Sequence, residues 1–498
     1  MPRHHTVHLH THHTIAPVDR RVFGGFLEHM GRAVYGGVYE PESPHADADG
    51  WRSDVLEALR GLDMTAMRYP GGNFVSGYHW QDGVGPREAR PRLRELAWNS
   101  VEPNAVGTDE FLALAARMGW EPMMAVNLGT GTPEEARNWV EYTNAATGTK
   151  YADLRAENGR EKPWGVKLWC LGNEMDGHWQ IGHVPAEEYG LRAQQTAKLI
   201  KDLDREAELV VCGSSMTFLP SYLEWDRTVL ERVGDHADYL SLHSYVGNRN
   251  GDTLDFLACP GAIDRQIEAA DATCRYVAAR RRSPKRAYLS FDEWNVWYKT
   301  FSGEHMNGAG RFAPPLIEER YNLEDALVVA GFLHSFVRHA DVVKIANLAQ
   351  IVNVIAPILA QPDGLLLQSI YWPFVMFSRR RNGTALRTAV EGDRYDAVSY
   401  GSTSHVDASA ILDGERLHVF VTNRDEGAAE VRIRVADTTI AACVDAELLA
   451  GPDPKTENDW DAPERVHAAG FEDVRIRDGE AVLSLPAWSF AAVSLRLG

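Results

Sequence analysis

Two glutamates, Glu174 and Glu293, occupy positions where the chain could carry out acid–base chemistry. Each closes an apolar run and has an amide or aromatic neighbour, in the stretches LWCLGNEMDG and SFDEWNVWY. Two carboxyl groups are the minimum set for hydrolysing a glycosidic bond, because one protonates the leaving oxygen while the other, ionised, attacks the sugar or activates water. A single glutamate at such a position often only caps a loop or pairs with an arginine. The prediction of a glycoside-cleaving site therefore depends on both residues together.

Neighbouring side chains could give the two carboxyl groups different pKa values. Burial or a nearby negative charge raises the pKa of a carboxyl group, whereas hydrogen-bond donors and arginine lower it. Candidates for this role are Arg68, Asn173, His243 and Tyr245.

Aromatic residues are dense in the same stretches of the chain. Most of them are expected in the core, but Trp98, Trp179 and Trp297 occur in predicted loops. Tryptophan has an apolar face and a polar N–H group, which suits it to stacking on a sugar ring in a wet cleft. We therefore expect these three tryptophans to contact substrate.

Eight short apolar runs between residues 20 and 375 alternate with longer stretches of helical periodicity. We interpret the runs as strands over 21–29, 64–72, 121–129, 166–174, 208–215, 237–245, 287–294 and 342–350. Continuous apolar character is typical of parallel strands buried on both faces. Eight such strands with helical crossovers predict an α/β fold, a (β/α)8 TIM barrel. An open doubly wound sheet would show the same alternation, but no GxGxxG or P-loop pattern follows the first run, which disfavours a nucleotide-binding version.

Polar residues gather at the carboxyl ends of these runs, which is where a parallel barrel forms its active site. They are Glu28, His29, Arg68, Asn73, Asn127, Asn173, Glu174, Ser214, Ser215, His243, Tyr245, Asp292, Glu293 and Gln350. An unpaired polar group inside a buried strand is unfavourable. The clustering therefore favours a functional site at this end of the barrel.

The stretches between the runs carry helix signals. Thr108 is expected to cap one helix, and Thr132 followed by Pro133 is expected to begin the next. Apolar residues at helical spacing over 189–203 predict a helix that packs on the outside of the barrel.

After about residue 380 the apolar residues alternate with a period of two. Segments 416–423, 430–437, 473–477 and 481–497 are separated by turn-rich stretches and predict a small antiparallel β-sandwich. The N-terminal segment TVHLHTHHTI alternates too and is expected to join it. We predict three parts: an N-terminal strand over 1–18, a catalytic barrel over 19–378 and the sandwich over 379–498.

The histidine-rich N-terminus allows two interpretations. His8, His10 and His12 would share one face of a strand, so a metal site is conceivable. No acidic or thiolate partner lies in the segment, and an edge strand needs polar protection in any case. We favour a solvated edge strand.

Composition excludes several classes of protein. The 498 residues carry a net charge of −19, which disfavours binding to nucleic acid or to an anionic membrane. Five cysteines without a CxxC spacing argue against a disulfide framework and a zinc ribbon, and Cys170 and Cys212 are expected to be buried. The chain has no apolar stretch near the roughly 18 residues of a membrane span, and its N-terminus lacks the apolar core of a secretory signal. We expect a soluble, cytoplasmic protein.

Six segments resemble the glycoside hydrolase family 51 α-L-arabinofuranosidases, in order along the whole predicted barrel. They are GGFLEHMGRAVYGGVYEP (24–41), RYPGGNFVSGYHWQDGVGP (68–86), WCLGNEMDGHWQIGH (169–183), SLHSY (241–245), FDEWNVWY (291–298) and ANLAQIVNVIAPI (346–358). This resemblance implies a barrel with the acid/base on strand four and the nucleophile on strand seven. Counting the predicted strands independently puts Glu174 on the fourth and Glu293 on the seventh.

The resemblance also implies roles for individual residues. Glu293 would attack the anomeric carbon and Glu174 would protonate the leaving oxygen and then activate water, a retaining mechanism without metal or organic cofactor. The residues that match positions holding the furanose hydroxyls are Glu28, Asn73, Asn173, Tyr245 and Gln350. Arg68 and His243 match residues that support the catalytic carboxylates, and Trp297 matches one at the mouth of the site. The Gly/Pro-rich segment 299–320 is where specificity is least predictable.

The implied substrates are arabinofuranosyl-containing oligosaccharides from arabinoxylan or arabinan, cleaved at their terminal residues. Family resemblance also implies a homo-oligomer, a hexamer, with no nucleic-acid or membrane partner. Three alternatives stay open: another glycosidase on the same scaffold (an endo-β-glucanase, β-xylosidase or galactofuranosidase), a non-catalytic carbohydrate-binding protein, and a metal-dependent barrel hydrolase.

Overall fold

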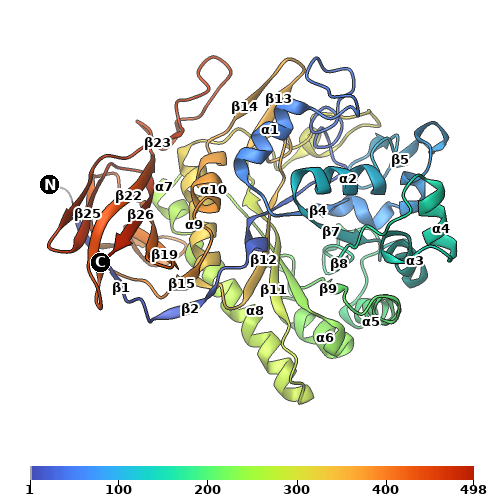
Figure 1. Ribbon diagram of the computed structural model, residues 1–498, viewed down its shortest axis with the longest axis horizontal. Coiled ribbons are helices and arrows are strands. Elements are labelled where there is room, and N and C mark those ends of the chain that lie inside the picture. The colour runs from blue at the N-terminus through green and yellow to red at the C-terminus, as the bar shows by residue number, and fades with distance from the viewer. Residues whose placement is uncertain (1–2) are drawn as a thin grey trace.

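The computed structural model describes residues 3–498, which form a barrel and an adjoining β-sandwich (Figure 1). The barrel is surrounded by helices, and the sandwich, orange to red in Figure 1, stands at one side of it. The described chain both begins and ends in the sandwich, since β1 (Arg3–Leu9) and β26 (Ser489–Leu497) belong to its sheets.

Eight parallel strands close the barrel, as the apolar runs predict. In chain order they are β3 (Gly24–Phe26), β4 (Ala66–Tyr69), β7 (Glu121–Val126), β8 (Leu168–Leu171), β9 (Glu208–Val211), β10 (Tyr239–Val246), β11 (Tyr288–Val296) and β12 (Val343–Ala349), and β12 pairs with β3. The prediction of a TIM barrel is confirmed. Most strands are shorter than the apolar runs because the run ends form turns, such as the 3-10 turn Arg20–Phe23 before β3.

Helices cover the outside of the barrel. They are α1 (Ser53–Leu62), α2 (Thr108–Met118), α3 (Pro133–Asn144), α4 (Lys150–Glu157), α5 (Ala186–Leu203), α6 (Glu224–Val233), α7 (Thr253–Leu257), α8 (Pro260–Arg281), α9 (Leu323–Arg338) and α10 (Tyr371–Ser378). Five short 3-10 turns follow the first one, over 73–77, 80–83, 87–89, 234–236 and 303–306.

The helix signals in the sequence are confirmed in two cases and wrong in one. Thr132 caps α3, accepting a 3.1 Å hydrogen bond from the backbone N–H of Glu135. The apolar face of α5 is buried, as its spacing predicts. Thr108 is not a cap, because α2 begins at Thr108 and Gly107 precedes it; the Glu110 carboxylate accepts the Gly107 N–H at 3.0 Å.

Two sheets build the sandwich. One has the order β16 (Ala389–Glu391), β1, β21 (Ala429–Val435), β25 (Glu480–Leu485) and β24 (Val474–Arg477). The other has the order β2 (Thr14–Pro17), β15 (Thr384–Leu386), β19 (Val406–Asp413), β20 (Arg416–Asn423), β26, β22 (Ile440–Leu449) and β23 (Ala468–Gly470). Three hairpins lie outside these sheets: β5 (Leu93–Glu95) with β6 (Ser100–Glu102), β13 (Ile358–Gln361) with β14 (Gly364–Leu367), and β17 (Arg394–Ala397) with β18 (Gly401–Ser404).

The sandwich differs from the sequence prediction in two respects. Segment 481–497 is not one strand, because the chain turns at Trp488, which has a positive φ of 49°, and β25 and β26 belong to different sheets. The sandwich is also not wholly antiparallel, since β1 pairs in parallel with β21.

The histidine-rich segment forms no edge strand. β1 ends at Leu9 and lies between β16 and β21, so His8, His10 and His12 do not share a strand face. The first two pair with different carboxylates, His8 Nε2 with Glu391 at 2.9 Å and His10 Nδ1 with Asp437 at 3.4 Å. Both acidic partners come from distant parts of the chain, so the sequence of this segment does not indicate them.

Helices α9 and α10 join the barrel to the sandwich. The imidazole of His334, buried in α9, contacts the hydroxyls of Ser409 and Thr422 at 2.8 and 3.0 Å. The ring of Phe377 in α10 stacks on that of Phe420 with 3.9 Å between centroids. The apolar core of the barrel therefore extends to one sheet of the sandwich, while the interior of the sandwich forms a second apolar cluster.

All five cysteines are free thiols, and Cys170 and Cys212 are buried as expected. Among residues 3–498, the structure contains no helix both long and apolar enough to cross a membrane.

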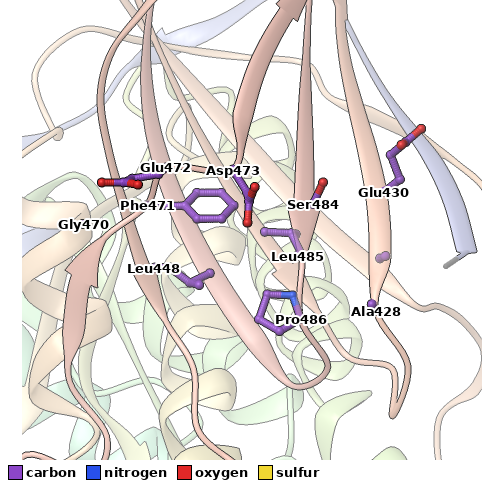
Figure 2. A pocket seen from close by; sticks show the side chains of 11 residues that line it. Ala428, Glu430, Leu448, Gly470, Phe471, Glu472, Asp473, Ser484, Leu485 and Pro486 are labelled. Atoms are coloured by element: carbon purple, nitrogen blue, oxygen red, sulfur yellow. The ribbon is translucent and has the colours of Figure 1, made fainter.

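A cavity of about 670 Å³ lies on the sandwich, outside the barrel. Figure 2 shows the side chains of Phe471, Leu448 and Leu485 gathered there, with the carboxylates of Glu430 and Glu472 standing on either side.

Candidate active site

Glu174 and Glu293 meet at the carboxyl end of the barrel strands. One carboxylate oxygen of each and Nδ1 of His243 all lie within 4.8 Å of one another. Both glutamates are at least 90% buried, although Glu174 follows β8 in a loop and Glu293 lies inside β11. The structure thus brings together the two glutamates that the sequence singles out.

Local backbone geometry orients the two side chains. Gly172, the residue after β8, has a φ of 91°. Glu174 has a φ of 42°, a conformation that is strained for a residue with a Cβ. The pairing register between β10 and β11 shifts between Ser241 and His243 of β10, which pair with Ser290 and Glu293 of β11. Such a bulge re-aims side chains, and here Asp292 and Glu293, neighbours in sequence, both face Arg68.

Three groups surround the carboxylate of Glu293. Arg68 donates to one oxygen at 2.6 Å, the Tyr245 hydroxyl donates to the other at 2.8 Å, and His243 Nδ1 lies 3.6 Å away. Burial by itself would raise the pKa of Glu293. The charges of His243 and Arg68 and the two hydrogen bonds outweigh it, so the pKa is lowered and the carboxylate is ionised.

Glu174 accepts hydrogen bonds at both oxygens. His243 Nδ1 lies 2.8 Å from one, and the indole N–H of Trp179 donates to the other at 2.5 Å. Burial alone would lower the pKa of His243, but Glu293, Glu174 and Asp292 raise it to about 9. His243 is therefore an imidazolium at neutral pH, and its second nitrogen lies 3.2 Å from the hydroxyl of Ser241.

Glu28 forms a third buried carboxyl group at this end. Its oxygens accept from the backbone N–H of Phe74, the indole of Trp98 and the amide of Gln350, each at 3.0 Å. Burial and the negative charge of Glu293 raise the pKa of Glu28 to about 8 despite these donors. The group is therefore largely neutral at pH 7.

The two asparagines that the resemblance assigns to furanose binding, Asn73 and Asn173, take different places. Asn73 lines the cavity above the glutamates. Asn173 is buried beneath it, accepting from Arg68 at 2.8 Å and donating to Gln180 at 3.3 Å.

A cavity of about 270 Å³ opens over the two glutamates. Seven of the ten predicted site residues line it: Asn73, described above, and Glu28, Glu174, Tyr245, Glu293, Trp297 and Gln350. The remaining three, Arg68, Asn173 and His243, are held just behind its wall by the contacts above. Trp98 and Trp179 line it too, as expected of loop tryptophans. The larger cavity on the sandwich lies among other residues and contains none of these groups.

Comparison with known proteins decides the family. Residues 58–255 match the family model described as α-L-arabinofuranosidase 1 domain, and residues 292–489 match that of the α-L-arabinofuranosidase C-terminal domain. An intracellular exo-α-(1→5)-L-arabinofuranosidase 1 of Bacillus subtilis is 47% identical over 422 residues, 84% of each chain. A solved family 51 α-L-arabinofuranosidase from Bifidobacterium longum superposes with a TM-score of 0.95 at 36% identity, covering 99% of both chains.

The chain belongs to the family 51 α-L-arabinofuranosidases. It is therefore a glycoside hydrolase, and the resemblance found in the sequence is confirmed. An exo-α-(1→6)-L-arabinofuranosidase of Bifidobacterium longum is also similar, at 40% identity over 97% of this chain and 95% of its own. The relatives thus include proteins named for two different linkages.

Several residues that line the cavity of this family 51 chain are not predicted as site residues from the sequence. They are Met30, Met216, Phe218, Arg249, Phe301 and Met306, which lie around the mouth. Apart from Met30 they lie outside the matching motifs, in loops after β9, β10 and β11. Phe301 and Met306 lie in segment 299–320, which the sequence already singles out, whereas only the position of their loops after predicted strands could have indicated Met216, Phe218 and Arg249.

One set of side chains in the described part of the chain could hold a metal ion, and it is Glu174, His243 and Glu293 themselves. Each of the three already takes part in hydrogen bonds with its neighbours, and a protonated imidazole is not a ligand. The donor set fits proton transfer better than coordination.

Proposed function

We propose that this family 51 chain is a retaining, exo-acting α-L-arabinofuranosidase. The observation that carries the proposal is the close approach of Glu174 and Glu293 beneath a small cavity. Carboxyl groups about 5–5.5 Å apart are typical of retaining glycosidases, whereas inverting enzymes leave about 6.5–9.5 Å for a water molecule. One carboxylate oxygen of Glu174 and one of Glu293 lie within 4.8 Å of each other, which supports the retaining class.

Glu293 is the nucleophile in this proposal. Its ionised carboxylate attacks the anomeric carbon and forms a covalent arabinosyl ester while the glycosidic bond breaks. Arg68 and Tyr245 hold the carboxylate in one orientation and keep it charged before the attack.

Glu174 is the acid in the first step and the base in the second. The proton for the first step comes from His243, whose Nδ1 lies 2.8 Å from a Glu174 oxygen. It can pass from the imidazolium to Glu174 and from there to the leaving oxygen. After the leaving group departs, Glu174 removes a proton from water, which attacks the ester and releases arabinose. The Trp179 indole orients the carboxylate throughout. Both steps use carboxyl groups and water, so we propose no metal or organic cofactor.

The polar side chains of the cavity hold the terminal sugar. Glu28, Asn73, Tyr245 and Gln350 face this cavity and would bind furanose hydroxyls, with Trp297 at its mouth. Asn173 lies behind Arg68, and we propose that it reaches the sugar when substrate enters. A volume of about 270 Å³, below the 300–1,000 Å³ of pockets for drug-sized ligands, suits one sugar residue and so supports exo action.

The finer properties of the enzyme are proposals that rest on its sequence and on the resemblance of its motifs to the family. We propose oligosaccharides derived from arabinan or arabinoxylan as substrates, a cytoplasmic location, and a hexameric assembly. Several similar proteins are named intracellular exo-α-(1→5)-L-arabinofuranosidases, including one from Streptomyces lividans at 44% identity over 96% of this chain. The domain extents of 1–18, 19–378 and 379–498 are proposed on the same footing.

Initial rates on four 4-nitrophenyl glycosides test the activity: the α-L-arabinofuranoside, β-D-xyloside, β-D-galactofuranoside and β-D-cellobioside. We expect the arabinofuranoside to dominate; dominant turnover of another glycoside would overturn the assigned sugar.

Glu174→Ala tests the acid role. A good leaving group needs little protonation, so we expect the variant to keep much more of the first step on the 4-nitrophenyl substrate than on an arabino-oligosaccharide. Glu174→Gln, which preserves the shape, is the matched control and should show the same selectivity. Equal losses on both substrates would contradict the role.

A further inference from the structure

Two exposed phenylalanines stand at the mouth of the active-site cavity. Phe218 is 75% exposed and Phe301 is 47% exposed, and both line the cavity that contains the catalytic glutamates. Isolated apolar side chains on a surface need no explanation, but aromatic rings that rim a functional cavity often mark a contact surface for a ligand.

Arg249 adds a polar group to the same rim. Its guanidinium carbon lies 4.9 Å from the centre of the Phe301 ring, which itself packs 4.5 Å from the ring of Trp297. Within residues 3–498 no carboxylate lies within 4.0 Å of Arg249, although the chain carries a net charge of −19. The N–H groups of this stacked guanidinium are therefore free to donate to a ligand.

The three residues lie on the side of the barrel where a leaving group must emerge. Phe218 follows β9, Arg249 follows β10 and Phe301 follows β11, which are successive strands around the barrel between β8, which leads to Glu174, and β11, which carries Glu293. In the proposed reaction Glu174 protonates the leaving oxygen. A cavity that suits one sugar residue leaves the rest of an oligosaccharide outside, over this rim.

Two buried glutamates fix the loops that carry Arg249 and Phe301. Glu324, fully buried, accepts from the amide of Asn248 at 3.1 Å and the hydroxyl of Thr253 at 2.7 Å. Glu319, also fully buried, accepts the backbone N–H groups of residues 298, 299 and 300. Loops held in this way are preorganised, so a ligand binding there would pay little ordering entropy.

We propose that Phe218, Arg249 and Phe301 form a binding site for the first sugar of the leaving group. The ligand is an uncharged sugar ring of an oligosaccharide. Its C–H face would stack on the phenylalanine rings and its hydroxyls would accept hydrogen bonds from the guanidinium. The inference rests on the proposed activity and extends it, since these residues would determine which leaving groups are preferred.

The test compares two substrates with the same terminal sugar. Methyl α-L-arabinofuranoside has no ring in its leaving group, whereas α-1,5-linked arabinobiose has one. For Phe218→Ala, Phe301→Ala and Arg249→Ala we expect the ratio of kcat/KM for arabinobiose to that for the methyl glycoside to fall about two- to tenfold, as the loss of one stacking or cation contact predicts.

Tyr276→Ala is the matched control, because Tyr276 is 53% exposed on α8 and does not line the cavity. Its ratio should equal that of the wild type. An unchanged ratio in all three rim variants would overturn the inference, as would a ratio that falls equally in the control. Failure of the wild type to cleave either arabinofuranoside would instead contradict the proposed function.

Discussion

Tyr245→Phe tests most directly the electrostatic control of Glu293, the proposed nucleophile. The substitution removes one hydroxyl, which donates to Glu293 at 2.8 Å, and keeps the ring that packs edge-on against Trp297 at 5.4 Å. Arg68 still donates to the other oxygen. The change therefore removes one donor to the ionised form and little else.

The size of the effect follows from the strength of that bond. A hydrogen bond to a charged group contributes about 1.5–3 kcal/mol, and one pKa unit corresponds to about 1.4 kcal/mol. Because Tyr245 is partly exposed, the lower end applies. The bond favours the charged carboxylate, so its loss raises the pKa of Glu293, by about one unit on these figures.

The assay is the pH dependence of kcat/KM on 4-nitrophenyl α-L-arabinofuranoside. Activity requires Glu293 to be ionised, so we expect the acid limb of the profile to move to higher pH by about one unit. Tyr276→Phe, which removes an exposed hydroxyl on α8, should leave the limb in place. An acid limb that coincides with the wild-type limb would refute the assigned role of the Tyr245 hydroxyl.

Two further predictions concern stability and metals. Burial lowers the pKa of His334 from 6.5 to about 3, so below pH 6.5 the unfolded chain binds a proton that the folded chain does not. This difference should remove about 1.6 kcal/mol of unfolding free energy between pH 6.5 and 5. His334→Gln should show a smaller decrease of Tm over that range; an identical decrease would contradict the assignment. Dialysis against EDTA should leave the rate unchanged, whereas a loss that added metal restores would contradict a reaction run by carboxyl groups alone.

The barrel could be predicted because its strands are buried on both faces. Such strands need apolar residues at nearly every position, and the eight apolar runs in the sequence follow directly from this requirement. Glu174 and Glu293 could be predicted for the same reason, since a charged residue at the end of an apolar run is conspicuous. Helix starts were harder: Thr132 and Pro133 mark the start of α3, but Thr108 is the first residue of α2 and not its cap.

The sandwich was only partly predictable. Period-two alternation identifies strands but not their partners, because every strand of a two-layered fold has the same apolar and polar faces. The segment 481–497 therefore looks like one strand, although Trp488 sends its halves into different sheets. The parallel pairing of β1 with β21 joins residues more than 400 positions apart, and no local signal records it.

Residue types and their order along the chain were enough to establish the barrel, the carboxyl pair and the family, since these depend on local burial patterns and long matching motifs. The charge state of the site depended on the tertiary structure. His243 becomes a cation because the carboxylates of Glu174, Asp292 and Glu293 surround it, and Glu293 stays ionised because His243, Arg68 and Tyr245 reach it from other strands. The mouth, with Phe218, Arg249 and Phe301, likewise exists only when loops after three strands meet. Electrostatic and stacking interactions act over a few ångströms in space, and separation along the chain does not reveal that distance.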